Sequence, residues 1–234
     1  LLKEVLDRAK EVGFTSLALT ADFSWVGNRE RETKTGFTVP PSYSVRQCID
    51  AMRSPAWTYD FMSRVPYGYK AVPDADFPAE SLVDFIAQQM KPEFDWKDAE
   101  WLANEWGGNL ALKGVVRADD AVKCLDHGFN SIWVSNHGGR QLDQGLGSCA
   151  VLPEIVDAVD KKSLIVVDGS ICRGTDILKA IALGADAVGM GRMQGYALAA
   201  AGSAGVVRML EILEDECSKA LGLMGVNRFT ELDR

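Results

Sequence analysis

Short apolar runs that alternate with helical patterns are the feature of this 234-residue sequence that most restricts its fold. Continuous apolar runs of this length are typical of strands that are covered on both faces. The five runs are Ser16–Thr20, Leu110–Lys113, Ile132–Ser135, Leu164–Asp168 and Ala187–Met190. The helical patterns between them include Ala118–His127, Leu152–Val159 and Thr175–Leu183. This alternation predicts right-handed βαβ units and therefore an α/β protein with a parallel sheet.

A weak internal repeat favours a barrel. Aligning Gly13, Gly128 and Gly184 superimposes three units, each made of a helix, the glycine at which the helix ends, and a strand. In this register, equivalent positions at the carboxyl ends of strands are occupied by Thr20, Ser135 and Gly191. Repeated βα units with polar residues at that end are typical of the (β/α)8 TIM barrel, whose active site lies on the same face.

Such a barrel needs eight strands, and the sequence contains five. We therefore expect a single partial barrel domain over 1–234, made of strands four to eight, with three further βα units preceding residue 1. The strand ends Thr20 and Lys113 are 93 residues apart (113 − 20), too far for one crossover. The excess, about 27–96, holds seven of the eight prolines and predicts a lid-like insertion with short helices over the site. The last segment, Gln194–Leu223, predicts one or two helices that close the barrel wall.

Charge and cysteine content exclude several classes of protein. Lys and Arg number 25 and Asp and Glu number 33, so the net charge of −8 argues against a nucleic-acid partner. No run of about 18 apolar residues occurs, and no membrane span is expected. The five cysteines are scattered and form no CxxC motif, which is typical of reduced thiols in a cytoplasmic protein. With only two histidines, we expect no metal site.

The segment Ser135–Asp143 (SNHGGRQLD) is the strongest chemical signal. It starts at a strand end, where His137 is suited to accept a proton near neutral pH. Arg140, three positions further on, carries a planar guanidinium that can hold a carboxylate by two hydrogen bonds. The two glycines between them allow a flat ligand to approach the backbone closely. We therefore expect a functional loop at this strand end.

The ends of the last two strands carry the second signal, a predicted phosphate site. It combines Asp168-Gly169-Ser170 with Gly191-Arg192, and backbone N–H groups at a helix N-terminus would share the phosphate with Arg192 and Arg173. The structural alternative is that the glycines only form turns and that Arg192 is a solvated surface charge.

Three further residues have both a functional and a structural interpretation. Lys113, at a strand end, can stabilise negative charge on a bound ring, or extend along the surface to solvent. Asp22 can orient the imidazole of His137, or cap a helix or turn. Arg29 lies in a charge run, Asn28-Arg29-Glu30-Arg31-Glu32, and such runs are usually solvated.

Ser135–Asp143 resembles the signature of the FMN-dependent α-hydroxy-acid oxidases and dehydrogenases, a family that includes glycolate oxidase, lactate oxidase, mandelate dehydrogenase and flavocytochrome b2. Three other segments are similar to this family in the same order along the chain. They are LALTADFSWVGNRERETKTGF, LALKGV and VVDGSICRGTDILKAIALGADAVGMGR. The resemblance implies a (β/α)8 barrel and an FMN cofactor.

The resemblance also implies a role for each matching residue. His137 would be the base, with Asp22 as its partner, and Arg140 and Arg29 would hold the substrate carboxylate. The implied FMN contacts are Thr20, Lys113, Ser135, Asp168, Gly169, Ser170, Gly191 and Arg192. One position departs from the family pattern, because Cys172 stands where an arginine is usual. Either Arg173 takes over its phosphate contact or phosphate affinity is weaker.

The implied reaction oxidises an (S)-2-hydroxy acid, such as lactate or glycolate, to the 2-oxo acid. His137 would take the hydroxyl proton while hydride passes to flavin N5, or would take the α-carbon proton in a carbanion route. Oxygen, or a quinone or cytochrome, would reoxidise the flavin, and the family tends to form homotetramers. Two alternatives are a phosphate-binding barrel similar to inosine-monophosphate dehydrogenase, and an inactive or partner-dependent half-barrel that binds a phosphorylated ligand.

Overall fold

The computed structural model of the chain describes residues 2–25, 27–36, 44–63 and 93–233. The chain divides into two compact units. The first contains Leu1–Phe14 and Arg29–Lys91, and the second contains Thr15–Asn28 and Pro92–Arg234. The predicted insertion at about 27–96 falls mostly in the first unit, and its residues 37–43 and 64–92 lie outside the described residues.

The described part of the first unit is helical. Its helices are α1 (Leu2–Glu11), α2 (Glu30–Thr35), α3 (Val45–Met52) and α4 (Pro55–Ser63). The start of α3 is fixed by a capping box, because the Ser44 hydroxyl accepts the N–H of Gln47 while the Gln47 side chain accepts the N–H of Ser44. The prediction of short helices in the insertion is thus confirmed for its described residues, and their position over the site stays a prediction.

The second unit is built on a five-stranded parallel sheet whose strands lie in sequence order. The strands are β1 (Ser16–Thr20), β2 (Asn109–Val115), β3 (Ser131–Val134), β4 (Leu164–Asp168) and β5 (Ala187–Gly189). All five apolar runs of the sequence are therefore strands, and their predicted ends differ from the observed ones by two residues at most. The α/β class and the partial barrel are confirmed.

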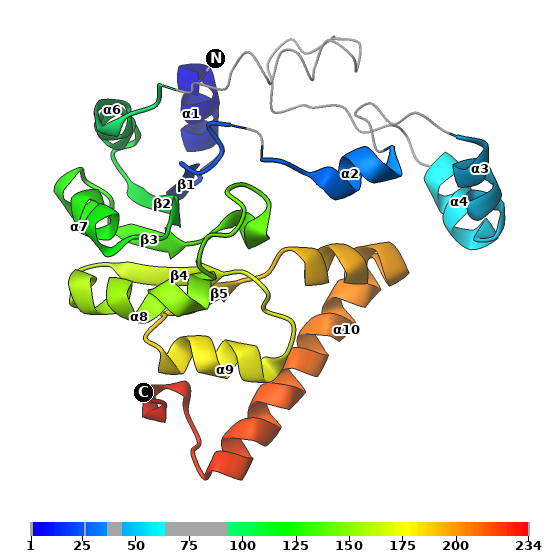
Figure 1. Cartoon of the computed structure of the whole chain (residues 1–234). Coiled ribbons are helices and arrows are strands. Elements are labelled where there is room, and N and C mark those ends of the chain that lie inside the picture. Colours follow the sequence, from blue (N-terminus) through cyan, green and yellow to red (C-terminus); the bar gives the residue numbers. More distant parts are fainter. Residues whose placement is uncertain (1, 26, 37–43, 64–92, 234) are drawn as a thin grey trace. The chain divides into compact units, whose positions relative to one another are not determined.

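Helices α7 (Ala118–Asp126), α8 (Ser148–Val159) and α9 (Gly174–Ala182) lie along one face of this sheet, and α6 (Trp96–Trp106) precedes β2 (Figure 1). Helices α7, α8 and α9 each join one strand to the next. Because these crossovers are all right-handed and run in the same direction along the sheet, the three helices lie on the same side of it. The residues that form the core between sheet and helices are fully buried or nearly so. They include Leu110, Leu112, Ile132, Val134, Ile165, Val167, Cys124, Leu152, Ile155 and Val159.

The opposite face of the sheet is only half-buried. Side chains alternate along each strand, so Ala111, Lys113, Trp133, Val166 and Asp168 point away from the helices. In a closed barrel this face would be the interior. Within the described residues, β1 and β5 each pair with a single neighbour and form the two edges of the sheet.

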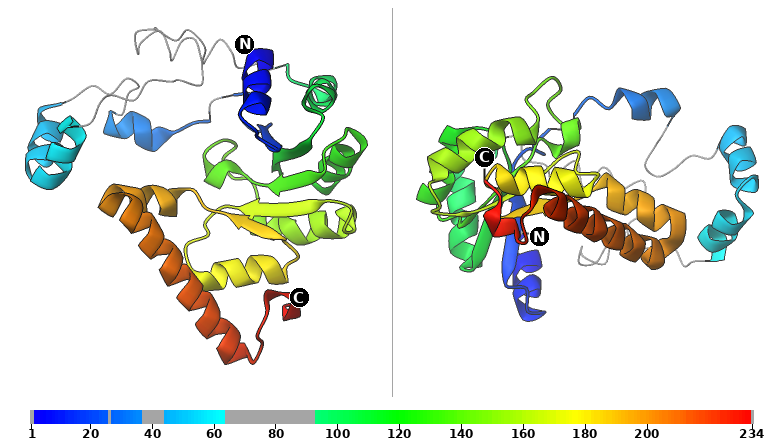
Figure 2. Two further views of the ribbon diagram at one scale, coloured as in Figure 1. Left: turned by 180° about the vertical axis from the view of Figure 1, so that it is seen from behind. Right: turned by 90° about the horizontal axis from the view of Figure 1, so that it is seen from below.

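The chain ends in α10 (Arg192–Met224) and a short turn, η2 (Phe229–Glu231). The backbone of α10 leaves the helical region at Ala201 and Gly202, and the two halves of the helix run in different directions (Figure 2). The prediction of one or two helices here is confirmed. In the second half, Cys217 and Leu221 pack on Leu178 of α9.

Helix α10 also has the length and apolar composition of a membrane-crossing helix, with a mean hydropathy of 1.4 over its most apolar window. Only 11% of that window is buried in the described structure, and the buried residues of α10, which are Met209, Leu213, Cys217 and Leu221, lie in its second half.

Candidate functional site

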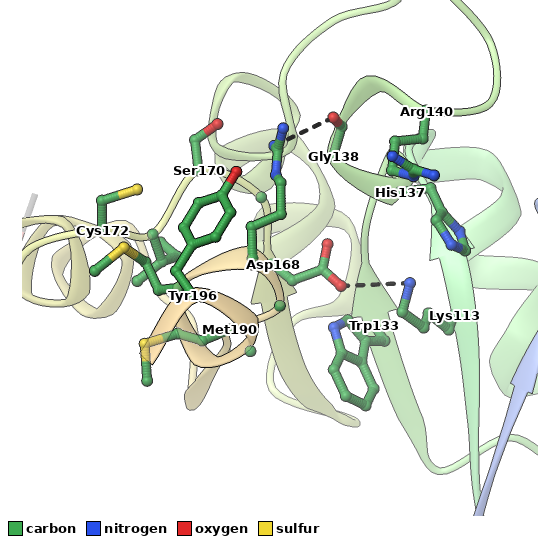
Figure 3. A pocket seen from close by; sticks show the side chains of 16 residues that line it. Lys113, Trp133, His137, Gly138, Arg140, Asp168, Ser170, Cys172, Met190 and Tyr196 are labelled. Carbon is green, nitrogen blue, oxygen red and sulfur yellow. Dashed lines mark hydrogen bonds and ion pairs between the residues drawn. The ribbon is translucent and has the colours of Figure 1, made fainter. Parts of the chain in front are cut away.

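A cavity of about 640 Å³ lies at the carboxyl ends of β2 to β5, entirely within the second unit (Figure 3). Eight of the sequence-predicted site residues line it. They are Lys113, His137, Arg140, Asp168, Gly169, Ser170, Gly191 and Arg192. We call the side of the cavity lined by Lys113, His137 and Asp168, together with their hydrogen-bond partners Asp22 and Ser135, the imidazole end. We call the part formed by Ser170, Cys172, Gly191, Arg192 and Tyr196 the α10 end.

Ser135 is the centre of the hydrogen-bond network at the imidazole end. Its hydroxyl donates to Asp168 Oδ1 (2.6 Å) and accepts from Lys113 Nζ (3.0 Å) and from the backbone N–H of His137 (3.1 Å). The Lys113 ammonium also lies 3.3 Å from Asp168 Oδ2. Because Ser135 is fully buried and all its hydrogen-bonding capacity is used, these groups hold one arrangement.

The imidazole of His137 is oriented by Asp22. Its Nδ1 lies 3.2 Å from Asp22 Oδ1, and the two side chains are 28% and 16% exposed. The ring of Phe23 lies 5.6 Å from the imidazole ring, measured between centroids. An ionised Asp22 accepts from Nδ1–H, which leaves Nε2 as the nitrogen with a free lone pair.

Two residues that sequence reasoning did not single out hold Asp22 in place. Gly114 forms an irregularity in β2 with φ of +101°, and a Cβ there would lie 2.7 Å from both Cβ and Cγ of Asp22. The Gln141 side-chain amide donates to the backbone carbonyls of Asp22 (3.0 Å) and Trp25 (2.7 Å). Gln141 lies in the motif, but nothing in the sequence indicated its partners. Gly114 directly follows the predicted strand Leu110–Lys113, and only the structure extends the strand through it to Val115.

Backbone strain marks the cavity. Five non-glycine residues in the described part of the chain have a positive φ, and two of them, His137 (57°) and Ser170 (58°), line the cavity. Residues in this region cost free energy and are held there by their surroundings, and they cluster at functional sites. At His137 the following glycines, Gly138 and Gly139, continue the left-handed turn.

Arg192 joins the two ends of the cavity. Its guanidinium donates to the carbonyl of Gly138 (Nη2 to O, 3.4 Å), and a Cβ on Gly138 would lie 3.1 Å from Nη2. Arg140 lies next to His137 at the opposite side of the cavity from Ser170, Cys172 and Tyr196 (Figure 3). The cavity therefore has cationic groups at both ends.

The remaining predicted residues lie elsewhere. Thr20 is the register partner of Lys113 at the end of β1. Arg173 does not line the cavity, and its Nη2 lies 2.7 Å from Glu216 Oε1. Arg29 belongs to the first unit, where its Nη1 lies 3.7 Å from Glu32 Oε2, and its contact with a substrate carboxylate stays a prediction.

Trp133 is a cavity residue that the motif analysis did not include. The Lys113 ammonium lies 5.8 Å from the centroid of its ring, a cation–π distance. Its indole Nε1 is buried and has no hydrogen-bond partner among the described residues. The signal was available in the sequence, because Trp133 and Ser135 are two residues apart on one strand pattern and share a face.

The cavity fits a flavin mononucleotide in its size and donor set. Its volume lies in the range of cofactor sites, and its walls include the apolar side chains of Trp133 and Met190. The buried donor Trp133 Nε1, which has no partner among the described residues, could donate to an acceptor atom of the flavin. The α10 end supplies Arg192 and the N-terminus of α10, which favour an anion.

The chain belongs to the FMN-dependent dehydrogenase family, whose model matches residues 1–234. It is 37% identical over 238 residues to an L-lactate dehydrogenase of Caulobacter sp. (strain K31), covering 100% of this chain and 62% of that protein. It is 38% identical over 234 residues to an L-lactate oxidase of Nostoc sp. (strain PCC 7120), covering 100% of this chain and 59% of that one.

Two solved structures are also similar. One is described as the monotopic membrane protein (S)-mandelate dehydrogenase, with a TM-score of 0.92, 34% identity, and coverage of 99% of this chain and 62% of the other. The second is a mandelate oxidase, with a TM-score of 0.76 and 33% identity, covering 99% and 58%. The chain thus spans about 60% of the length of the relatives that it matches. The family resemblance expected from the motifs is confirmed.

Proposed function

We propose that this chain carries the catalytic residues of an FMN-dependent enzyme that oxidises a small (S)-2-hydroxy acid to the 2-oxo acid. The pairing of His137 with Asp22, beside the Lys113–Ser135–Asp168 network at one end of the cavity, is the observation that carries this proposal. L-Lactate is the first substrate to test, because two relatives are named as L-lactate dehydrogenase and L-lactate oxidase.

His137 is the base in this proposal. Asp22 accepts from Nδ1, so Nε2 takes the hydroxyl proton of the substrate, and the Asp22 carboxylate then stabilises the imidazolium. Arg140, on the same loop, holds the substrate carboxylate through its planar guanidinium. Arg29 is a second candidate for that contact. Removal of the α-carbon proton by the same base, the carbanion route, uses the same residues.

Bound FMN would supply the acceptor for two electrons, at N5 of its ring. Lys113 contributes a fixed positive charge that favours negative charge on the ring, and Asp168 and Ser135 keep the ammonium in place. The phosphate is held at the α10 end by Arg192 and nearby backbone groups.

The electron acceptor and assembly belong to the same proposal. The names of the relatives include both an oxidase and a dehydrogenase, so oxygen and a quinone or cytochrome are both proposed acceptors. The five cysteines are free thiols, which supports a cytoplasmic, reducing environment. A homotetramer is proposed from the family resemblance alone.

His137→Gln tests the proposal. We expect the variant to retain flavin, while the rate at which L-lactate bleaches the flavin absorbance in the absence of oxygen falls by about 10²–10⁴-fold. His127→Gln is the matched control, because His127 caps α7 and does not line the cavity. Undiminished bleaching in His137→Gln contradicts the role of His137. A colourless wild-type protein that binds inorganic phosphate supports the non-catalytic half-barrel instead.

A further inference from the structure

Glu216, on the second half of α10, contacts the start of α9 and does not line the cavity. Its Oε1 lies 2.7 Å from Arg173 Nη2, and its Oε2 accepts the backbone N–H of Gly174 at 2.7 Å. The Glu216 side chain is only 20% exposed, whereas Glu211 and Asp215 on the same helix are 55% and 58% exposed. Glu216 is therefore turned into the structure, whereas these two neighbours face solvent.

The backbones of the two helices approach each other closely at this point. A Cβ on Gly174 would lie 2.6 Å from Glu216 Cβ and 2.7 Å from the backbone nitrogen of Cys217. The Cys217 thiol donates to the carbonyl of Gly174 at 3.4 Å. Below this contact, Leu178, Cys217 and Leu221 form an apolar cluster. Only glycine fits at position 174, and the apolar cluster packs next to this contact between the two helices.

The backbone amides at the start of α9 already have protein acceptors. Asp176 Oδ2 accepts the N–H groups of Cys172 (3.1 Å) and Arg173 (2.9 Å), and Glu216 accepts that of Gly174. Two carboxylates therefore occupy the helix terminus at which an anion would otherwise bind. A phosphate in the cavity would therefore be bound by the groups that line it, chiefly Arg192 and the loop 169–172.

We propose that Glu216 is a positioning residue for cofactor binding. Together with Arg173 it forms a clamp that holds the loop 169–172 against the cavity, and Arg173 is part of the clamp and not a ligand of the phosphate. The inference rests on the proposed FMN site. Cys172 stands where an arginine is usual in the family. In this proposal Arg173 does not replace the phosphate contact of that arginine.

The test compares FMN with riboflavin, which lacks the phosphate, in Glu216→Gln. The substitution keeps the size of the side chain and removes the charge that holds Arg173. We expect the Kd for FMN to rise about tenfold and the Kd for riboflavin to change less than about threefold, measured by flavin fluorescence. If Arg173 were a phosphate ligand held back by Glu216, the variant would release it and FMN would bind more tightly.

Arg173→Gln and the double variant separate the two roles further. A clamp predicts that Arg173→Gln alone also weakens FMN binding, and that the double variant loses no more affinity than Glu216→Gln alone. A direct phosphate contact predicts a further loss when Arg173 is replaced in the Glu216→Gln background. Glu211→Gln is the matched control, because it breaks the exposed Arg208–Glu211 pair on the same helix, and it should leave both affinities unchanged.

Hydrogen exchange of the segment 169–176 provides a reading that needs no flavin. We expect faster exchange in Glu216→Gln than in the wild type and in Glu211→Gln. A wild-type protein that binds neither flavin overturns the proposed function, and exchange alone then decides whether the clamp exists. Unchanged exchange overturns the clamp. Faster exchange with an unchanged ratio of FMN to riboflavin affinity shows a purely structural contact and overturns the role in cofactor binding.

Discussion

The two ends of the cavity are fixed in different ways. At the imidazole end the functional side chains bind one another, as Lys113, Ser135 and Asp168 do. At the α10 end the side chains face the cavity while the backbone behind them is held from outside by Asp176 and Glu216. Proton transfer needs fixed distances between heavy atoms, whereas binding an anion needs exposed charge on a stable frame. The difference between the ends therefore matches the different tasks proposed for them.

Among the variants that compare the two ends, Asp22→Asn should have the largest effect, and it should act at the imidazole end alone. A neutral amide cannot stabilise the imidazolium of His137, so we expect flavin reduction by L-lactate to slow by about 10²–10³-fold. FMN affinity should change little. Rapid-mixing absorbance measures the reduction rate. Asp143→Asn is the control, because this exposed motif residue accepts the N–H of Gln144 and does not line the cavity. A variant with an unchanged reduction rate would show that Asp22 does not act on the base.

Arg192→Met should show the opposite pattern. Loss of the guanidinium removes a charge-assisted contact to the phosphate, and we expect the Kd for FMN to rise about 10–100-fold with a much smaller change for riboflavin. Fluorescence titration measures both affinities. At saturating FMN the reduction rate should stay within about threefold of the wild type. Equal losses for the two flavins would refute the assignment of the α10 end to the phosphate.

Gly114→Ala tests how closely the imidazole end is fitted. The added methyl group would overlap the Asp22 side chain, and φ of +101° is unfavourable for alanine. We expect a loss of about 1–2 kcal/mol in the free energy of unfolding and about tenfold slower flavin reduction. Chemical denaturation and rapid mixing measure the two effects. Gly222→Ala is the control, because a Cβ there meets nothing within 4 Å. Equal behaviour of the two variants would mean that Asp22 tolerates displacement.

The sequence was most informative where its pattern is local. Strand runs and the motif Ser135–Asp143 located the sheet and the imidazole end, because period-two alternation and short-range spacing determine both. The partners of Arg173 could not be found in this way. Glu216 is 43 residues from Arg173 (216 − 173) and looks like any other acidic residue on an amphipathic helix. The placement of Gly114 against Asp22 likewise depends on the register of two strands that are far apart in sequence.

The same contrast between packed and accessible groups should appear in the thiols of Cys124 and Cys172. Their effect on the free energy of unfolding should be the smallest of those predicted here. Cys124 is fully buried between helix and sheet, and burial raises the pKa of its thiol to about 12, whereas Cys172 is exposed at the α10 end. The unfolded thiol ionises near pH 9, so the folded state holds its proton more tightly. The resulting stability is fully present below pH 9 and is lost as pH rises towards 12. At pH 10 the loss attributable to Cys124 should be roughly 1 kcal/mol.

Chemical denaturation gives the free energy of unfolding of the wild type and of Cys124→Val at pH 7 and at pH 10. The loss due to Cys124 is the change between the two pH values in the wild type minus the same change in the variant. We expect the variant to lose less stability on the change to pH 10, because valine has no proton to release.

A thiol reagent should label Cys172 in the folded protein and Cys124 only after unfolding, since reaction requires an accessible thiolate. FMN should slow the labelling of Cys172 more than riboflavin does, because only FMN carries the phosphate to the α10 end. Equal protection by the two flavins would place Cys172 away from the phosphate and would weaken the division of the cavity into two differently built ends.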